Sequence, residues 1–342
     1  MTAAYPDGAA RIRMGLNQSV CECALRIGSG YSVVMNALDP ASFPDFFIVG
    51  AAKAGTTAVW HWLRQHENVF LPDVKEPGYF AFNNVSARPE KGPYDPAYVA
   101  RITTDSKSYS SLYRAAGSRL KGDASPFYLS HPPAAYAIAR VRPDARIIVI
   151  LRNPVERAFS QYLHHVRDGL EPSRSFEAAL DAEPHRLANR WSAAYGYMAN
   201  GHYPVQIARF LAVFPKDQVL FLEYGALQCD PEESWGRICD HLNLHRRPIV
   251  LSDRVNATST LSQVPGRPGI SRHLTHPGPI QSTLKKIISP QIRTRMRQYL
   301  EGPGKAVPRL SDATRAALTQ KYMQDRPQLE ALVGSSLDHW YA

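Results

Sequence analysis

The sequence is poor in cysteine and contains no long hydrophobic run. Its 342 residues include four cysteines, too few for a disulfide scaffold and without the spacing of a zinc site. No segment approaches the roughly 18 consecutive apolar residues of a membrane-spanning helix. Residues 1–30 also lack the apolar core of a secretory signal. We therefore expect a cytoplasmic protein, with no membrane span, whose cysteines are reduced.

Charged residues are also few, at 20% of the chain, whereas hydrophobic residues make up 44%. This balance excludes global disorder and allows a sizeable core. The 40 Lys and Arg residues outnumber the 30 Asp and Glu residues, which gives a formal charge of +10. Such an excess indicates an anionic partner, which can be nucleic acid, an anionic lipid surface, or a phosphorylated or sulfated small molecule.

Short apolar runs alternate with amphipathic segments from Phe43 onward. The runs predict buried strands at 46–49 and 146–151, and we expect further short strands at 119–123 and 218–223. The amphipathic segments predict helices at 56–66, 131–141, 154–168, 175–188, 203–214 and 231–242, and again from about 290. Residues 67–110 are rich in Pro, Gly, Asn and Tyr, and we expect a long loop region with short helices there.

Strands that alternate with helices predict an α/β fold with three layers, α/β/α, around a mostly parallel central sheet. We expect residues 1–42 to form an N-terminal extension and residues 43–342 to form a single domain. Within that domain the segment 252–285 is irregular and is the candidate lid over the bound ligands. Because such folds bind ligands at the carboxyl ends of their strands, the turns after 46–49 and 146–151 are the first places to search for a site.

The first of these turns has the composition of a phosphate-binding loop. It runs from Gly50 to Thr57 and opens the helix at 56–66; its candidate ligand-binding residues are Gly50, Ala52, Lys53, Ala54, Gly55, Thr56 and Thr57. Glycines let successive backbone N–H groups point at one anion, and the helix N-terminus adds a favourable dipole. In triphosphate-binding loops a lysine follows the second glycine, but here that position holds Thr56, and Lys53 comes earlier. The loop therefore suits a single phosphate with one further group better than a triphosphate.

The second turn also carries a phosphate-binding pattern. The strand at 146–151 ends in Arg152, which can offer a two-pronged donor to a phosphate. No acidic residue that could hold magnesium follows this strand, which disfavours a magnesium-bound triphosphate. Ser160 lies two turns into the next helix, where a serine gains nothing as a cap, so we interpret it as a phosphate ligand. We interpret Arg157 and His164 on the same polar stripe as a solvated helix face.

These two segments carry a resemblance to a known family. The strand followed by Gly50-x-x-Lys53-x-Gly55-Thr56-Thr57 resembles the 5'-phosphosulfate loop of sulfotransferases that use 3'-phosphoadenosine 5'-phosphosulfate (PAPS). The segment from Arg152 to Ser160 is similar to the family's 3'-phosphate segment, and the resemblance covers roughly residues 43–260. It implies in-line transfer of a sulfuryl group from PAPS to a hydroxyl or amine of a carbohydrate or a small natural product. It also implies that Lys53 neutralises the leaving 5'-phosphate and that no metal is required.

The resemblance leaves more than one candidate for the base that takes the acceptor proton. Lys75-Glu76-Pro77-Gly78-Tyr79-Phe80 resembles the segment of the carbohydrate, heparan-type branch in which an acid before an aromatic pair is the base, and this implies Glu76. The segment at 122–128 resembles a second substrate-side segment and makes Asp123 an alternative; a histidine is the third. Arg272 is the candidate for a late contact with the 3'-phosphate.

Two other functions remain open at the level of the sequence. A P-loop kinase or phosphotransferase would need a magnesium-binding acid and affinity for a triphosphate. A basic nucleic-acid-binding protein would need interleaved basic and aromatic residues on one surface, whereas here the basic residues are scattered, so no specific nucleic-acid partner is expected. His273 and His276 are interpreted as a loop pair, because no carboxylate or cysteine accompanies them to hold a metal. We expect residues 81–118 and 255–285 to form the acceptor pocket.

Overall fold

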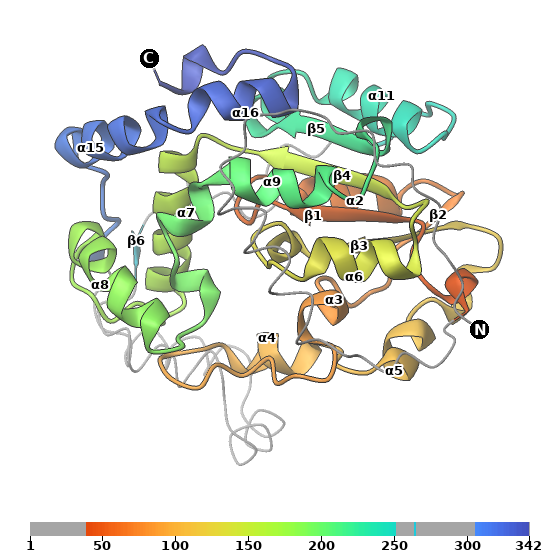
Figure 1. Cartoon of the computed structure of the whole chain (residues 1–342), viewed down its shortest axis with the longest axis horizontal. Coiled ribbons are helices and arrows are strands. Elements are labelled where there is room, and N and C mark those ends of the chain that lie inside the picture. Colours follow the sequence, from red (N-terminus) through yellow and green to blue (C-terminus); the bar gives the residue numbers. More distant parts are fainter. Residues whose placement is uncertain (1–38, 251–262, 265–304, 342) are drawn as a thin grey trace, which may run out of the picture. The chain divides into compact units, whose positions relative to one another are not determined.

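Five parallel strands form the central sheet, in the order β2-β3-β1-β4-β5 (Figure 1). They are β1 (Phe46–Gly50), β2 (Val69–Phe70), β3 (Leu120–Ala124), β4 (Arg146–Leu151) and β5 (Val219–Glu223). All four pairings between neighbours are parallel. The predicted α/β class with a parallel central sheet flanked by helices is confirmed, and β2 is a strand that the sequence pattern did not indicate.

The computed structural model describes residues 39–250, 263–264 and 305–341. They lie in one unit of the chain, Asp39–Ala342. The segment 1–38, the greater part of the expected lid at 252–285, and Arg272 lie outside the described residues, so the expected domain limits stay predictions. None of the helices within the described ranges has the length and apolar character needed to span a bilayer.

Both faces of the sheet are covered, which explains why β1 and β4 are almost continuously apolar. Every residue of β1 is buried, as are the residues of β4 from Ile147 to Leu151. The crossover helices cover both faces: α6 (Ala134–Val141) and α9 (Tyr203–Leu211) lie in front of the sheet in Figure 1, whereas α2 (Thr56–Arg64) lies behind it. This arrangement follows from right-handed crossovers, because the chain moves from β1 toward the β2 edge through α2 and in the opposite direction, to β4 and then β5, through α6 and α9.

The remaining helices lie mainly around the carboxyl ends of the strands and along the edges of the sheet (Figure 1). The α-helices are α3 (Tyr79–Phe82), α4 (Pro96–Arg101), α5 (Ser106–Ser111), α7 (Pro154–Arg167), α8 (Phe176–Ala188), α10 (Tyr224–Cys229), α11 (Pro231–His241), α15 (Asp312–Met323) and α16 (Arg326–Val333). Short 3-10 turns are η1 (Pro40–Ser42), η2 (Arg114–Ala116), η3 (Pro126–Tyr128), η4 (Ala193–Tyr195), η5 (Ala199–Gly201), η6 (Lys216–Gln218) and η8 (Asp338–Trp340). A separate antiparallel pair joins β6 (Gln263–Val264) to β7 (Lys305–Ala306).

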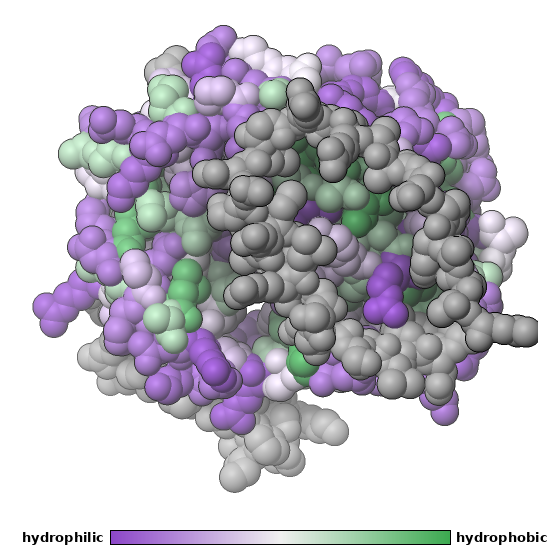
Figure 2. All heavy atoms as spheres, in the orientation of Figure 1, coloured by the Kyte–Doolittle hydropathy of each residue, from purple (hydrophilic) through white to green (hydrophobic). Residues whose placement is uncertain are grey.

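Helix α7 begins and packs as its sequence dictates. The Asn153 side chain accepts hydrogen bonds from the N–H groups of Val155 and Glu156 at 3.0 and 3.3 Å, as an N-cap does. Its apolar face buries Val155 and Tyr162 in a cluster that includes Phe176 of α8. On the side in view in Figure 2, hydrophilic residues dominate the outline of the described part, as expected when the apolar faces turn inward.

The register between β1 and β3 depends on a glycine. Phe46 of β1 pairs with Gly122 of β3, and a Cβ added at Gly122 would lie only 2.1 Å from the Phe46 ring. Gly122→Ala is therefore expected to lower the free energy of unfolding by about 2–3 kcal/mol through overpacking, measured by urea denaturation. Gly225→Ala is the matched control, because a Cβ there meets nothing within 4 Å; equal losses in both variants would contradict this explanation.

Candidate active site

The turn between β1 and α2 curls tightly around its lysine. Gly55, the N-cap of α2, has a left-handed φ of 89°, and a Cβ there would lie 2.9 Å from the Tyr224 ring. Lys53 itself has a φ of 70°, which is uncommon for a residue other than glycine. Residues held in such conformations require support from their surroundings and occur often at functional sites.

The same turn keeps most of its backbone donors available. The Ala51 N–H donates to the carbonyl of Ile150 at 2.6 Å, and the Ala54 N–H donates to the carbonyl of Ala51 at 3.2 Å. Within residues 39–250, 263–264 and 305–341, no acceptor is found for five other N–H groups, which belong to Ala52, Lys53, Gly55, Thr56 and Thr57. A loop with these donors at the start of a helix can bind an anion.

Lys53 brings a cation to this turn. Among the described residues its Nζ forms no hydrogen bond or ion pair. Burial and the positive charge of Arg167 lower the pKa of Lys53 to about 8, although Asp168 and Glu76 act in the opposite direction. An ammonium group that is desolvated and unpaired is stabilised by a bound anion.

Arg152 joins the end of β4 to this turn. Its Nη1 donates to the carbonyl of Lys53 at 3.1 Å, and its guanidinium lies 4.7 Å from the centre of the Tyr224 ring. Its own carbonyl accepts a hydrogen bond from the hydroxyl of Tyr203 at 2.8 Å. These contacts bring the two sequence motifs together, although about a hundred residues separate them in the chain, and they hold Arg152 in a fixed position.

The polar stripe of α7 is more buried than expected. Ser160 is only 4% exposed and Arg157 only 1%. Arg157 donates through Nη2 to the carbonyl of Tyr197, and its buried Nε has no partner in the part of the chain that the structure describes. The prediction that Arg157 belongs to a solvated face is wrong, because the segment that contains η4 and η5 covers this side of the helix.

The end of α7 adds charged residues that the sequence analysis did not select. His164 is also not simply solvated, since its Nδ1 lies 2.7 Å from Nη2 of Arg167, and Arg167 Nε donates to Asp168 at 2.7 Å. Burial and the positive charges of Lys53 and Arg167 lower the pKa of His164 to about 2. Helical spacing could have indicated these residues from the sequence, because it places His164 one turn and Arg167 two turns after Ser160.

Glu76 approaches the site from the segment before α3. It has a left-handed φ of 63°, it forms an ion pair with Lys75, and its side chain is 23% exposed. Its negative charge raises the pKa of Lys53 and contributes to the raised pKa of buried Asp123. Glu76 is therefore a partly exposed carboxylate within electrostatic reach of Lys53.

Asp123 lies in a different environment at the end of β3. It is fully buried and accepts hydrogen bonds from the hydroxyls of Ser125, Tyr109 and Tyr128 at 2.6, 2.7 and 2.9 Å. Burial raises the pKa of Asp123 to about 6, against the effect of these hydrogen bonds. Asp123 therefore has no exposed surface with which to contact an acceptor, whereas Glu76 is partly exposed.

Comparisons with known proteins decide the family. The family model described as "Sulfotransferase family" matches residues 44–248. The chain belongs to the sulfotransferase family. It is therefore an enzyme that transfers a sulfuryl group, and the resemblance seen in the sequence is confirmed.

Relatives of this sulfotransferase include human heparan sulfate glucosamine 3-O-sulfotransferase 6, which is 29% identical over 259 residues, with 72% of this chain and 68% of the relative covered. Human bifunctional heparan sulfate N-deacetylase/N-sulfotransferase 3 is 27% identical over 196 residues, with 55% and 21% covered. Among solved structures, a sulfotransferase from Alicyclobacillus acidocaldarius matches with a TM-score of 0.66 and 28% identity, over 88% of this chain and 99% of that one.

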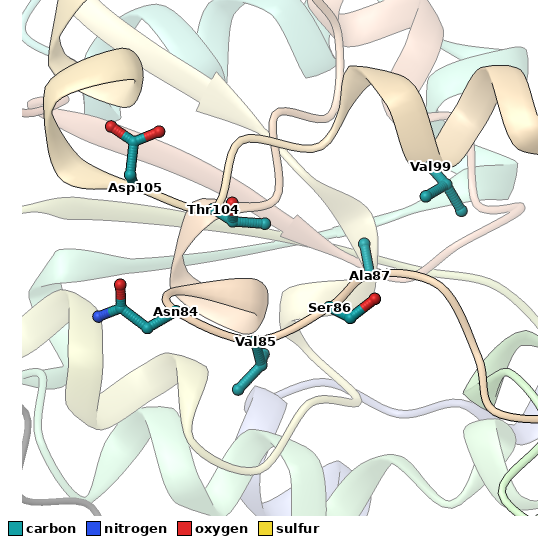
Figure 3. A pocket seen from close by; sticks show the side chains of 7 residues that line it. All are labelled: Asn84, Val85, Ser86, Ala87, Val99, Thr104 and Asp105. Atoms are coloured by element: carbon teal, nitrogen blue, oxygen red, sulfur yellow. The ribbon is translucent and has the colours of Figure 1, made fainter.

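A hollow of about 490 Å³ lies within the stretch expected to form the acceptor pocket (Figure 3). Its one charged residue, Asp105, accepts a hydrogen bond from the Ser108 N–H at 2.8 Å and so caps α5. Asn84 and Asp105 lie at one end of the hollow and Val99 at the other (Figure 3). Because no residue of the Lys53 turn lines it, we assign it no part in the sulfotransferase reaction.

Proposed function

We propose that this sulfotransferase uses PAPS as its donor and transfers the sulfuryl group to a hydroxyl or amine of a carbohydrate. The observation that supports the proposal is the turn at 50–57, where several amides and the ammonium of Lys53 have no partner among the described residues and where Arg152 contacts the Lys53 carbonyl. Such a site suits one 5'-phosphate with its sulfuryl group, and we assign Arg152 and, in the following helix, Ser160 to a 3'-phosphate. The acceptor class rests on relatives whose names include heparan sulfate O- and N-sulfotransferases.

The residues divide the reaction between them. The acceptor oxygen or nitrogen forms a bond to sulfur while the bond between sulfur and the 5'-phosphate oxygen breaks in line with it. Lys53 and the amides of the turn stabilise the charge that develops on the sulfuryl and 5'-phosphate oxygens. Glu76 takes the proton of the acceptor. The roles of Gly50, Ala52, Ala54, Gly55, Thr56, Thr57, Arg152 and Ser160 in holding the nucleotide belong to this proposal.

No residue with a metal-binding role is needed for these steps. The described part of the chain contains no group of three or more His, Cys, Asp or Glu side chains that could hold a metal ion. Arg272 stays a predicted contact of the 3'-phosphate, and a cytoplasmic location also stays a prediction.

The experiment that tests the proposal is calorimetry with three nucleotides. We expect adenosine 3',5'-bisphosphate to bind without magnesium, and adenosine 5'-monophosphate, which lacks the 3'-phosphate, to bind about 10- to 100-fold more weakly. ATP with magnesium is the discriminating control for a triphosphate site, and tighter binding of ATP would contradict the proposal. The acceptor is then sought by incubating PAPS with heparan-type oligosaccharides and small natural products, with mass spectrometry to detect the added sulfuryl group.

A further inference from the structure

Asp123 is surrounded by hydroxyl groups rather than by cations. Ser125 Oγ donates to its Oδ1, and the hydroxyls of Tyr109 and Tyr128 donate to its Oδ2. All four side chains are buried. An ionised carboxylate only accepts hydrogen bonds, so the hydrogens of these hydroxyls point at Asp123 and their lone pairs point away from it.

Two of these hydroxyls also bind the backbone that follows Glu76. The Gly78 N–H donates to Ser125 Oγ at 3.2 Å, and the Phe80 N–H donates to the Tyr128 hydroxyl at 3.3 Å. Each hydroxyl thus donates to Asp123 and accepts from the start of α3. Chains of hydrogen bonds with one direction strengthen each other in a buried environment.

This support matters because the segment from Glu76 to Phe80 is locally unfavourable. Glu76 and Gly78 have φ values of 63° and 70°, and Gly78, the N-cap of α3, offers no side chain to cap it. Helix α3 has only four residues, too few to be stable on its own backbone hydrogen bonds. A left-handed glutamate persists only where its surroundings hold it.

We propose that Asp123, through Ser125 and Tyr128, is a positioning residue that holds Glu76 in place for the reaction. The proposal rests on the proposed role of Glu76 as the base. Asp123 has no exposed surface with which to contact an acceptor or a nucleotide; it orients two hydroxyls, which in turn fix the amides of Gly78 and Phe80. Asp123 was one of the candidate bases, and this role accounts for its burial and for its three hydroxyl partners.

Tyr109 provides a matched control. Its hydroxyl makes a hydrogen bond to Asp123 at 2.7 Å, as short as those of the other two, but it comes from α5 and accepts no N–H group of the segment 76–80. Tyr109→Phe therefore removes one hydrogen bond from Asp123 without removing a link to the backbone. Tyr128→Phe also removes one hydroxyl, but this hydroxyl accepts the hydrogen bond of the Phe80 N–H, so a link to the backbone of the segment is lost.

The test compares Ser125→Ala, Tyr128→Phe and Asp123→Asn with Tyr109→Phe. We expect the first three to lower kcat about 10- to 100-fold on a heparan-type oligosaccharide, because a shift of about 1 Å at the reacting groups can cost this much. The affinity for adenosine 3',5'-bisphosphate should change less than about twofold. Hydrogen exchange, read by mass spectrometry, should become faster at the amides of 78–80 in these three variants and not in Tyr109→Phe.

The outcomes separate this inference from the function it rests on. If Glu76→Gln leaves kcat unchanged, the proposed role of Glu76 fails. If Glu76→Gln loses activity while Ser125→Ala and Tyr128→Phe behave like Tyr109→Phe in kcat and in hydrogen exchange, the positioning role of Asp123 is overturned. Hydrogen exchange gives this answer without any acceptor, so the second result does not depend on the identity of the sugar.

Discussion

Lys53→Ala is expected to reduce sulfuryl transfer at least about a thousandfold. Removal of a single donor to developing negative charge already costs about 10²–10³ in kcat, and Lys53 is a full charge in a largely desolvated turn. The measurement is single-turnover formation of adenosine 3',5'-bisphosphate from PAPS. Lys216→Ala is the control, because Lys216 is exposed on η6 before the start of β5. Full activity of the Lys53 variant would contradict the proposed role of Lys53 in the reaction.

The pH profile of the wild-type protein tests the role of the Lys53 ammonium independently of mutation. The pKa of Lys53 is lowered to about 8, so the ammonium form is complete well below pH 8 and is lost as the pH rises through that value. We expect kcat/KM, which reports the free enzyme, to fall on this alkaline side. With the anionic nucleotide bound the pKa should rise, and the fall in kcat should move to higher pH.

Glu76→Gln is expected to lower kcat by about 10²–10⁴, the usual contribution of a general base. Glutamine keeps the shape of the side chain but cannot take the proton, so the affinity for adenosine 3',5'-bisphosphate should stay within about twofold. The measurement is steady-state transfer to a heparan-type oligosaccharide, together with calorimetry of nucleotide binding.

Lys75→Met tests whether Glu76 acts as the base or matters only through its ion pair with Lys75. Glu76 forms an ion pair with Lys75, both partners being partly exposed, and exposed pairs contribute little, about 0–1 kcal/mol. If the pair itself mattered most, Lys75→Met would lose as much activity as Glu76→Gln. We expect a loss of less than about fivefold for Lys75→Met.

The sheet could be predicted from the sequence because its strands are buried on both faces. Residues 146–151 are apolar after the first position, and the structure begins and ends β4 at those residues. Helix boundaries were predicted less accurately than strand boundaries. The helix expected at 131–141 begins at Ala134, because Pro132 and Pro133 precede it in a turn. The two-residue strand β2 is too short to produce any periodic signal.

The site could be predicted only where a local pattern encodes it. The turn at 50–57 and the pair of Arg152 and Ser160 carry such patterns, and the structure places Arg152 against the carbonyl of Lys53. The burial of Arg157 could not be foreseen, because the residue that accepts its hydrogen bond, Tyr197, lies forty residues further along. The hydroxyls around Asp123 come from α5, from η3 and from Ser125, which lies between β3 and η3, and helical or strand periodicity cannot relate them.

The position of β1 has a consequence for how the chain acquires its structure. Both neighbours of β1 in the sheet, β3 and β4, are made later, so the strand has no partner on the ribosome until β3, which ends at Ala124, has emerged. Until then the apolar run Phe46–Val49 is exposed and prone to aggregate. Contacts between segments so distant in sequence also slow folding. The nucleotide turn is thus among the later features to form during synthesis, and chaperones that protect nascent apolar strands should increase the yield of active enzyme.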